Sequence, residues 1–235
     1  MTSALTVNAG PADRPHCKRH CLLDFSGVLT VGMREASRAF CVRSGLEPDA
    51  YHQAMRTNPV GQRLYTDIEI GRISQTEWNE GAAGLLGLDP INLMARLLAD
   101  TRPEPRLIAL TRQARAAGIK TALLSNSFGL DPYNPYRELG VADLFDVTVL
   151  SEQCGIAKPD PAIYRHTLDL LDLPGDACIF VDDQAINLPP AAALGLTTVH
   201  AQEPRRTVEL VAELFADVGG RSWLAAALTP VAPSC

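Results

Sequence analysis

The sequence predicts an α/β fold in which a parallel sheet is sandwiched by helices and a helical segment is inserted after the first strand. Three observations support this prediction. Short apolar stretches alternate with helical patterns from about residue 105 onward, which is typical of parallel sheets with right-handed crossovers. Residues 32–105 show only helical spacing. Polar residues follow the apolar stretches, at the sheet edge where such folds bind ligands.

The composition is that of a globular protein and excludes two classes of partner. The chain has 235 residues, of which 46% are hydrophobic and 20% charged, with a formal net charge of -6. No basic stripe is present to hold nucleic acid, and no apolar run approaches the roughly 18 residues of a membrane span. Residues 1–15 lack the pattern of a secretion signal. We therefore expect a cytoplasmic protein with free thiols and no membrane partner.

The N-terminal half divides into three segments. Residues 1–15 mix Gly, Pro, Ala and polar residues without a period, which predicts a mobile tail. Residues 16–31 contain a short apolar strand that ends at Asp24. Residues 32–105 carry apolar residues at spacings of three and four, interrupted by Gly, Pro and capping residues. This segment is predicted to be entirely helical.

The second half alternates between the two kinds of element. We expect helices at 105–118, 160–173, 186–195 and 207–219, and strands at 119–126, within 141–151, at 177–183 and at 196–201. Together with 16–31, residues 106–220 are predicted to form one α/β core. Residues 221–235 are predicted to be a C-terminal extension.

Polar side chains gather where the predicted strands end. Because the carboxyl ends of parallel strands meet at one edge of a sheet, these side chains should converge. Three of them are acids, which repel one another unless a cation lies between them, and oxygen ligands suit Mg²⁺. The converging residues are Asp24, Ser125, Asn126, Lys158, Asp182 and Asp183. The sequence thus predicts a magnesium site, with Lys158 as a counter-charge.

Four motifs resemble those of a known family. "LLDFSGVLT", "TALLSNS", "GIAKPDPAIY" and "CIFVDDQAIN" occur in this order and are similar to the signature motifs of the haloacid dehalogenase superfamily. The resemblance covers about residues 19–217 and is nearest to the phosphatase domain of soluble epoxide hydrolases and its bacterial relatives. It implies a Rossmann-like core and a helical cap, which we define as residues 32–105.

The resemblance also implies a two-step phosphoryl transfer on a small phosphorylated metabolite. Asp24 would attack phosphorus, and water would hydrolyse the aspartyl phosphate. Lys158 would orient Asp24 and the phosphate, while Ser125 and Asn126 would bind phosphate oxygens. The implied Mg²⁺ ligands are Asp24, the carbonyl of Ser26, and Asp183, with Asp182 as a direct or indirect partner. Arg56 and Arg63 are the candidate substrate-binding residues of the cap.

Ser26 is the one departure from the family pattern. Family phosphatases carry a second aspartate there, as the acid and base worth about 10²–10⁴-fold in rate. A phosphatase that is slow on alkyl esters, or that uses another acid from the cap or the substrate, is one interpretation. A dehalogenase, with Arg56 or Arg63 binding halide or carboxylate, is a second. A binding or regulatory protein is the third. A phosphonatase is set aside because residues 32–105 contain no lysine.

The cap motif "EIGRIS" allows two interpretations. Tyr65, Asp67, Glu69 and Arg72 lie in or beside it and would either form the substrate lid or lie on a solvated helix face. Exposed cap faces are also compatible with a homodimer.

Overall fold

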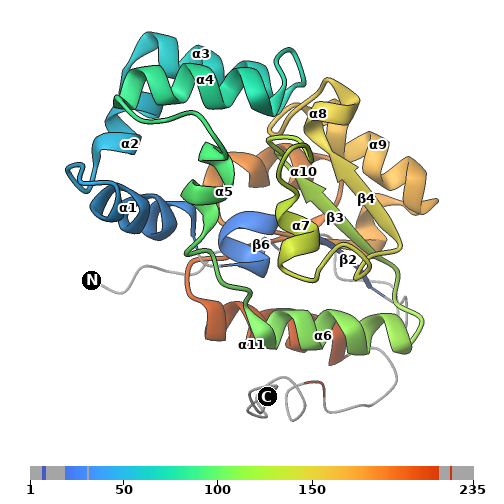
Figure 1. Ribbon diagram of the computed structural model, residues 1–235. Helices are drawn as coiled ribbons and strands as arrows, with labels where there is room; N and C mark the ends of the chain where they lie inside the picture. Colours follow the sequence, from blue (N-terminus) through green and yellow to red (C-terminus); the bar gives the residue numbers. More distant parts are fainter. Residues whose placement is uncertain (1–6, 9–18, 31, 217–222, 224–235) are drawn as a thin grey trace.

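The protein is built around a six-stranded sheet (Figure 1). The computed structural model describes residues 7–8, 19–30, 32–216 and 223. The strands lie in the order β1-β6-β5-β2-β3-β4. Their bounds are β1 (Val7–Asn8), β2 (His20–Leu23), β3 (Thr121–Ser125), β4 (Val147–Leu150), β5 (Cys178–Asp182) and β6 (Thr197–His200).

The five predicted strands are confirmed as one parallel sheet. β2 lies between β3 and β5, and every neighbouring pair from β6 to β4 is parallel. The prediction of a tail did not include β1, which pairs antiparallel with β6. This two-residue strand covers the open edge of β6 through backbone hydrogen bonds, which need no apolar pattern in the sequence.

Helices cover both faces of the sheet, as expected for parallel strands buried on two sides. α6 (Pro105–Ala116) and α11 (Pro204–Ala216) lie together on one face and share its hydrophobic cluster through Leu107 and Val211. α9 (Pro161–Leu171) and α10 (Leu188–Ala193) lie on the other face. Because helices cover both faces of the parallel strands, a ligand is expected at the strand ends rather than on a face of the sheet.

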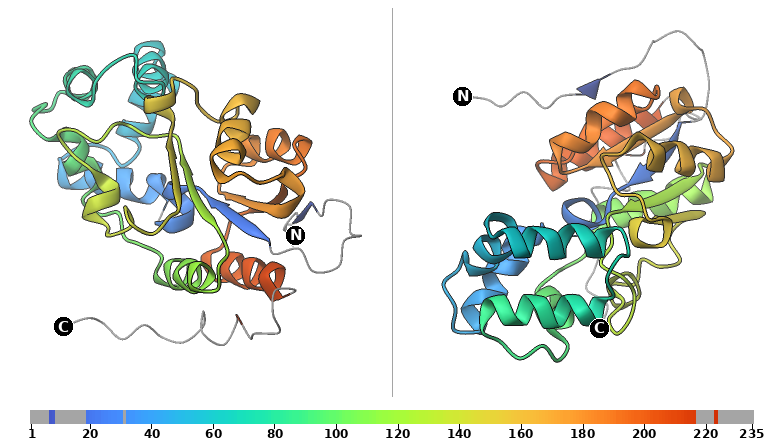
Figure 2. Two further views of the ribbon diagram at one scale, coloured as in Figure 1. Left: turned by 90° about the vertical axis from the view of Figure 1, so that its right-hand side faces the viewer. Right: turned by 90° about the horizontal axis from the view of Figure 1, so that it is seen from above.

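The cap is helical and has its own core. It comprises α1 (Met33–Arg43), α2 (Ala50–His52), η2 (Gln53–Thr57), α3 (Pro59–Glu69), α4 (Gln75–Leu86) and α5 (Leu93–Leu98). Phe40, Met55, Trp78 and Leu97 are buried in a cluster separate from those of the sheet. Figure 2 shows these helices to one side of the sheet and its covering helices.

The remaining elements are short and differ in part from the prediction. They are η1 (Phe25–Leu29), α7 (Pro135–Glu138), α8 (Ser151–Cys154), η3 (Gly175–Ala177) and η4 (Ala185–Asn187). Helices of one turn carry too few residues to show a period, so α7 and α8 were not predicted. The last predicted helix begins earlier, at Pro204, and its expected end at 217–219 lies outside the described residues, as does most of the predicted extension.

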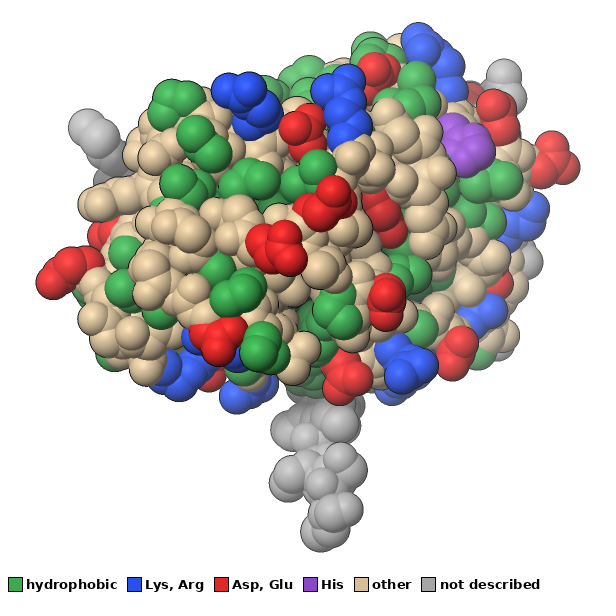
Figure 3. Space-filling view, turned by 45° about the horizontal axis from the view of Figure 1, so that its top comes forward, with side chains coloured by type: hydrophobic (Ala, Val, Ile, Leu, Met, Phe, Trp, Pro, Cys, Tyr) green, Lys and Arg blue, Asp and Glu red, His purple; other side chains and the backbone are tan. Residues whose placement is uncertain are grey.

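Among the described helices, none is both long and apolar enough to cross a membrane. On the face shown in Figure 3, acidic and basic side chains are interspersed rather than separated by sign.

Candidate active site

Asp24 and Lys158 form a buried ion pair at the carboxyl ends of the strands. Asp24 directly follows β2 and is 4% exposed. Lys158 Nζ lies 2.7 Å from Asp24 Oδ1 and 2.7 Å from Asp182 Oδ2, and it donates to the carbonyl of Leu124 at 2.9 Å. All three donors of the ammonium group are therefore used. The lysine is held rigidly between the first and fourth motifs.

The two adjacent acids after β5 have different environments. Asp182 is fully buried and accepts hydrogen bonds from Lys158, the Gln184 backbone and the Asn187 side chain. Asp183 Oδ1 is also buried but accepts no hydrogen bond from any residue that the structure describes. Asp182 is thus saturated as an acceptor, whereas Asp183 keeps an oxygen for another ligand.

The three carboxylates are close enough to share a cation. One oxygen from each of Asp24, Asp182 and Asp183 lies within 4.8 Å of the other two. Burial raises the pKa of Asp24 to about 7, against the lowering effect of Lys158 and with the help of the two neighbouring acids. Burial and Asp182 likewise raise the pKa of Asp183 to about 6. The single positive charge of Lys158 therefore does not balance the three carboxylates. The carboxylate oxygens of this cluster are ligands that suit Mg²⁺.

Lys158 stays protonated in this cluster. Burial alone would lower its pKa, but the charges of Asp24 and Asp182 outweigh that effect and raise the pKa above its ordinary value. The ammonium group is consequently a permanent positive charge beside Asp24.

The residues after β3 have two roles. Tyr136 donates a hydrogen bond to Ser125 Oγ at 3.0 Å, and burial raises the pKa of this phenol so that it remains a donor. Asn126, which we predict to bind phosphate, lines the cavity and also holds the loop of Lys158. Its Oδ1 accepts from the Lys158 backbone at 2.8 Å, and its Nδ2 donates to the Lys158 carbonyl at 3.0 Å. This pair connects residues 32 positions apart, so no local sequence pattern could show it.

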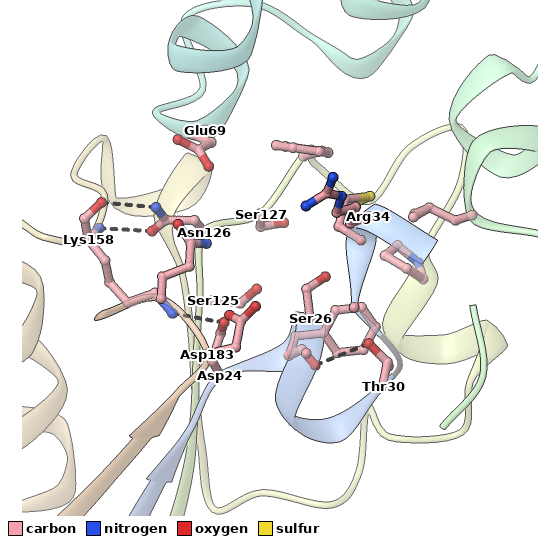
Figure 4. Close-up of a pocket in the computed structure, with 18 of the residues that line it drawn as sticks. Asp24, Ser26, Thr30, Arg34, Glu69, Ser125, Asn126, Ser127, Lys158 and Asp183 are labelled. Carbon is pink, nitrogen blue, oxygen red and sulfur yellow. Dashed lines mark hydrogen bonds and ion pairs between the residues drawn. The ribbon is translucent and has the colours of Figure 1, made fainter. Parts of the chain in front are cut away.

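A cavity of about 660 Å³ lies between this site and the cap. Glu69 points into it from the cap, and Ser26 and Arg34 lie on the opposite side (Figure 4). The guanidinium of Arg56 also lines the cavity and lies 3.8 Å from the centre of the Tyr65 ring. The cap thus supplies both charged and aromatic groups to the site.

The prediction for Arg63 is not supported. Its side chain is exposed, and it is not among the residues that line the cavity. Tyr65 and Glu69 both line the cavity and lie one helical turn apart on α3. Arg63 precedes Tyr65 by two residues, which places it about 200° around the helix from that face.

Comparison with known proteins decides the family. The profile of the haloacid dehalogenase-like hydrolases matches residues 18–195, which include all four motifs. The chain belongs to this family. The resemblance that the motifs predicted is thereby confirmed, and with it the hydrolase class.

Individual relatives are similar in sequence to parts of this chain. The sesquiterpene phosphatase astK of Aspergillus oryzae is 27% identical over 152 residues, covering 63% of this chain and 77% of the relative. The mouse acyl-CoA dehydrogenase family member 10 is 38% identical over 109 residues, covering 46% of this chain. That match spans only 10% of the mouse protein.

A solved structure from the same family has the same fold. The HAD family enzyme BT-2542 of Bacteroides thetaiotaomicron, solved in complex with magnesium and inorganic phosphate, superimposes with a TM-score of 0.61. It is 25% identical, and the alignment covers 79% of this chain and 96% of that enzyme.

Within the family fold, the sequence analysis missed two residues that shape the site. Tyr136 reaches Ser125 from α7, in a stretch without a motif. Arg34 stands at the start of α1, where a charged residue is ordinary in any helix. Neither residue carried a signal that separates it from a surface position.

Proposed function

We propose that this hydrolase is a Mg²⁺-dependent phosphatase that acts on a small phosphorylated metabolite through an aspartyl phosphate on Asp24. The observation that carries the proposal is the ion pair of Asp24 with Lys158 beside an Asp183 oxygen that lacks a partner among the described residues. A nucleophilic carboxylate, a fixed cation and a metal ligand are the groups that phosphoryl transfer requires.

We propose Asp24, the carbonyl of Ser26, and Asp183 as the magnesium ligands. The hydrogen bonds support Asp183 over Asp182, because Asp182 already accepts from Lys158 and Asn187, while the Ser26 carbonyl is proposed from the resemblance to the family motif. Asp182 then has a positioning role toward Lys158. When bound, the ion would offset the charge of the carboxylates and of a phosphate.

The chain's own residues provide the remaining steps. Asp24 Oδ forms a bond to phosphorus while the bond to the leaving oxygen breaks, and Lys158 stabilises the charge on the phosphoryl oxygens. Ser125 Oγ, oriented by Tyr136, donates to one of these oxygens. Water then attacks phosphorus and releases phosphate and free Asp24. The Asn126 contacts to the Lys158 backbone keep the lysine in place during both steps.

We also propose that the chain is a core of residues 16–31 and 106–220 with the cap at 32–105. The separate hydrophobic cluster of the cap supports this division. The two connections run side by side, because Thr30 pairs with Pro103 and the Glu104 amide donates to the Leu29 carbonyl at 2.7 Å. Such a paired connection allows the cap to move relative to the core as substrate enters and product leaves.

The cytoplasm is our proposed location. Cys21, Cys41, Cys154 and Cys178 are free thiols, which supports a reducing compartment.

A dehalogenase is the second candidate, and two observations favour it. Ser26 offers no carboxylate for proton transfer, and a halide leaves without needing a proton. Arg34 and Arg56 line the cavity and could bind a halide or carboxylate. The Asp183 oxygen that lacks a partner among the described residues is available to bind a metal ion. This supports the phosphatase, since dehalogenation of this type uses no metal.

Phosphate release with and without Mg²⁺ tests the proposal. Wild-type protein is assayed beside Asp24→Asn on a panel of alkyl and aryl phosphates, with halide release from 2-haloacids measured in parallel. We expect Mg²⁺-dependent phosphate release that Asp24→Asn abolishes. Metal-independent halide release would favour the dehalogenase. Tight binding of phosphorylated ligands without turnover would favour a regulatory protein.

A further inference from the structure

Ser26 stands where family phosphatases have the residue that donates and accepts a proton, and another residue of the cavity can take this role. This inference rests on the proposed function. An alkyl leaving group needs a proton, and a serine hydroxyl is a poor source near neutral pH. The acids that line the cavity are Asp24, Glu35, Glu69 and Asp183. Asp24 and Asp183 already have roles, and Glu35 is exposed beside Gly32 at the start of α1. Glu69 remains.

Glu69 is well placed to reach the leaving group. It is the last residue of α3 and points from the cap into the cavity, while Asp24 lies on the floor at the end of β2 (Figure 4). In an in-line displacement the leaving oxygen faces away from the nucleophile. With Asp24 on the core side, that oxygen faces the cap.

Glu69 and Asn126 both line the cavity, and Asn126 holds the Lys158 backbone. A direct contact between cap and core lies close to Glu69 in the chain. Two residues further, Gly71 adopts φ +68°, and a Cβ there would lie 2.3 Å from the carbonyl of Glu152 in α8. The turn after Glu69 therefore rests directly on core backbone, and only glycine allows this approach.

The surroundings of Glu69 suit a proton carrier. Burial raises its pKa to about 7, against the lowering effects of Arg56, Lys158 and Asn126. Its position at the C-terminal end of α3 adds to this, because the helix dipole disfavours a negative charge there. Burial, with the charge of Glu69 among the further causes, raises the pKa of both Tyr51 and Tyr65, so these cap residues are neutral phenols. Both protonation states are thus available near neutral pH.

We propose that Glu69 is a catalytic acid and base that carries out, from the cap, the proton transfers that an acid at position 26 would perform. In the first step the Asp24 oxygen bonds to phosphorus, the bond to the leaving oxygen breaks, and the Glu69 carboxyl gives its proton to that oxygen. In the second step the Glu69 carboxylate takes a proton from water as the water oxygen attacks phosphorus. The Asp24–phosphorus bond then breaks, phosphate leaves, and both residues are restored.

The test is a leaving-group series on Glu69→Gln, which keeps the size and polarity of the side chain but cannot transfer the proton. Glu80→Gln is the matched control, since Glu80 is an exposed cap glutamate outside the cavity. We expect Glu69→Gln to lower kcat/KM on alkyl phosphates by about 10²–10³-fold and to lower kcat/KM on 4-nitrophenyl phosphate far less, because nitrophenolate leaves without a proton and kcat/KM reports only the first step. The second step has no leaving group, so kcat should fall on both substrates. Glu80→Gln should match the wild type on both substrates.

A rescue experiment separates proton transfer from a merely structural role. Ser26→Asp added to Glu69→Gln should restore alkyl phosphate turnover, because it returns an acid to the site from the core side. Equal loss of kcat/KM on all substrates, no loss, or loss without rescue would overturn the role of Glu69 while leaving the phosphatase intact. If the wild type releases no phosphate, or if Asp24→Asn turns over like the wild type, the proposed function fails and this inference fails with it.

Discussion

Gly27 and Asp183 approach so closely that a Cβ on residue 27 would lie 2.5 Å from Asp183 Oδ2. Gly27 also has φ +76°, a conformation that side chains rarely adopt. The turn after Asp24 can therefore lie against Asp183 only because residue 27 has no side chain. Glycine here serves the proposed metal site, and it is more than a flexible turn residue.

Gly27→Ala should weaken Mg²⁺ binding by more than tenfold, because the methyl group displaces the Asp183 carboxylate. It should also cost about 1–2 kcal/mol of stability from backbone strain. Gly45→Ala is the matched control: its φ is +73°, but a Cβ there meets nothing within 4 Å. Isothermal titration with Mg²⁺ and denaturant unfolding measure both effects. Equal Mg²⁺ affinity in the two variants would contradict the role of Gly27.

Lys158→Met should destabilise the metal-free protein by about 3–5 kcal/mol, the usual cost of removing one partner from a buried ion pair. It leaves Asp24 and Asp182 buried together without their shared cation. Lys120→Met is the control. Lys120 Nζ donates to the Leu171 carbonyl at 2.6 Å, and a hydrogen bond of this kind is worth about 0.5–1.5 kcal/mol. Urea unfolding of both variants provides the comparison, and similar losses would contradict the prediction.

The raised pKa values of Asp24 and Asp183, to about 7 and about 6, predict how stability depends on pH. An acid whose pKa is raised by folding binds more protons in the folded state, so metal-free stability falls as pH rises from about 4 to 7. Mg²⁺ stabilises the ionised carboxylates. It should therefore raise the thermal midpoint more at about pH 7.5 than at about pH 5.

Thermal unfolding in EDTA and in Mg²⁺ at both pH values checks this expectation. Asp183→Asn removes one of the two titrating acids and should show a smaller response to Mg²⁺. A larger Mg²⁺ effect at the lower pH, or an undiminished effect in Asp183→Asn, would count against a metal held by these carboxylates.

The sequence correctly predicted that the polar residues after the strands converge at one edge of the sheet, because parallel strands bring their carboxyl ends together even when they are far apart in the chain. Asp24 and Lys158 meet there as expected from the alternation of strands and helices. The sequence alone did not show which of the two acids, Asp182 or Asp183, pairs with Lys158 and which is left to bind a metal. Neighbouring residues at a strand end point to opposite sides of the sheet, and only the structure shows that Lys158 lies on the side of Asp182.

The cap was predictable only as a set of helices. The direction of Glu69 depends on how α3 docks against the core, through contacts such as that of Gly71 with Glu152. Helical spacing describes which residues share a face, but not what that face meets. For the same reason the spacing could not separate Arg56, which lines the cavity, from Arg63, which does not.

Gln75 joins the cap to the core and predicts a further variant. Its side chain is 2% exposed, donates to the carbonyls of Phe128, Gly129 and Tyr133, and accepts from the Tyr133 amide at 2.9 Å. Gln75→Ala should cost about 1–3 kcal/mol by leaving these backbone groups unpaired. It should also raise KM, because α4 loses its attachment to the loop after β3 and the cap closes less often over bound substrate.

Gln153→Ala is the control, since Gln153 is an exposed glutamine outside the cavity. Hydrogen exchange of the Tyr133 amide reports the attachment directly and should quicken in Gln75→Ala alone. If KM and this exchange rate match those of the control, then Gln75 stabilises α4 without restraining the cap. The closed position would in that case depend on the contact between Gly71 and Glu152 instead.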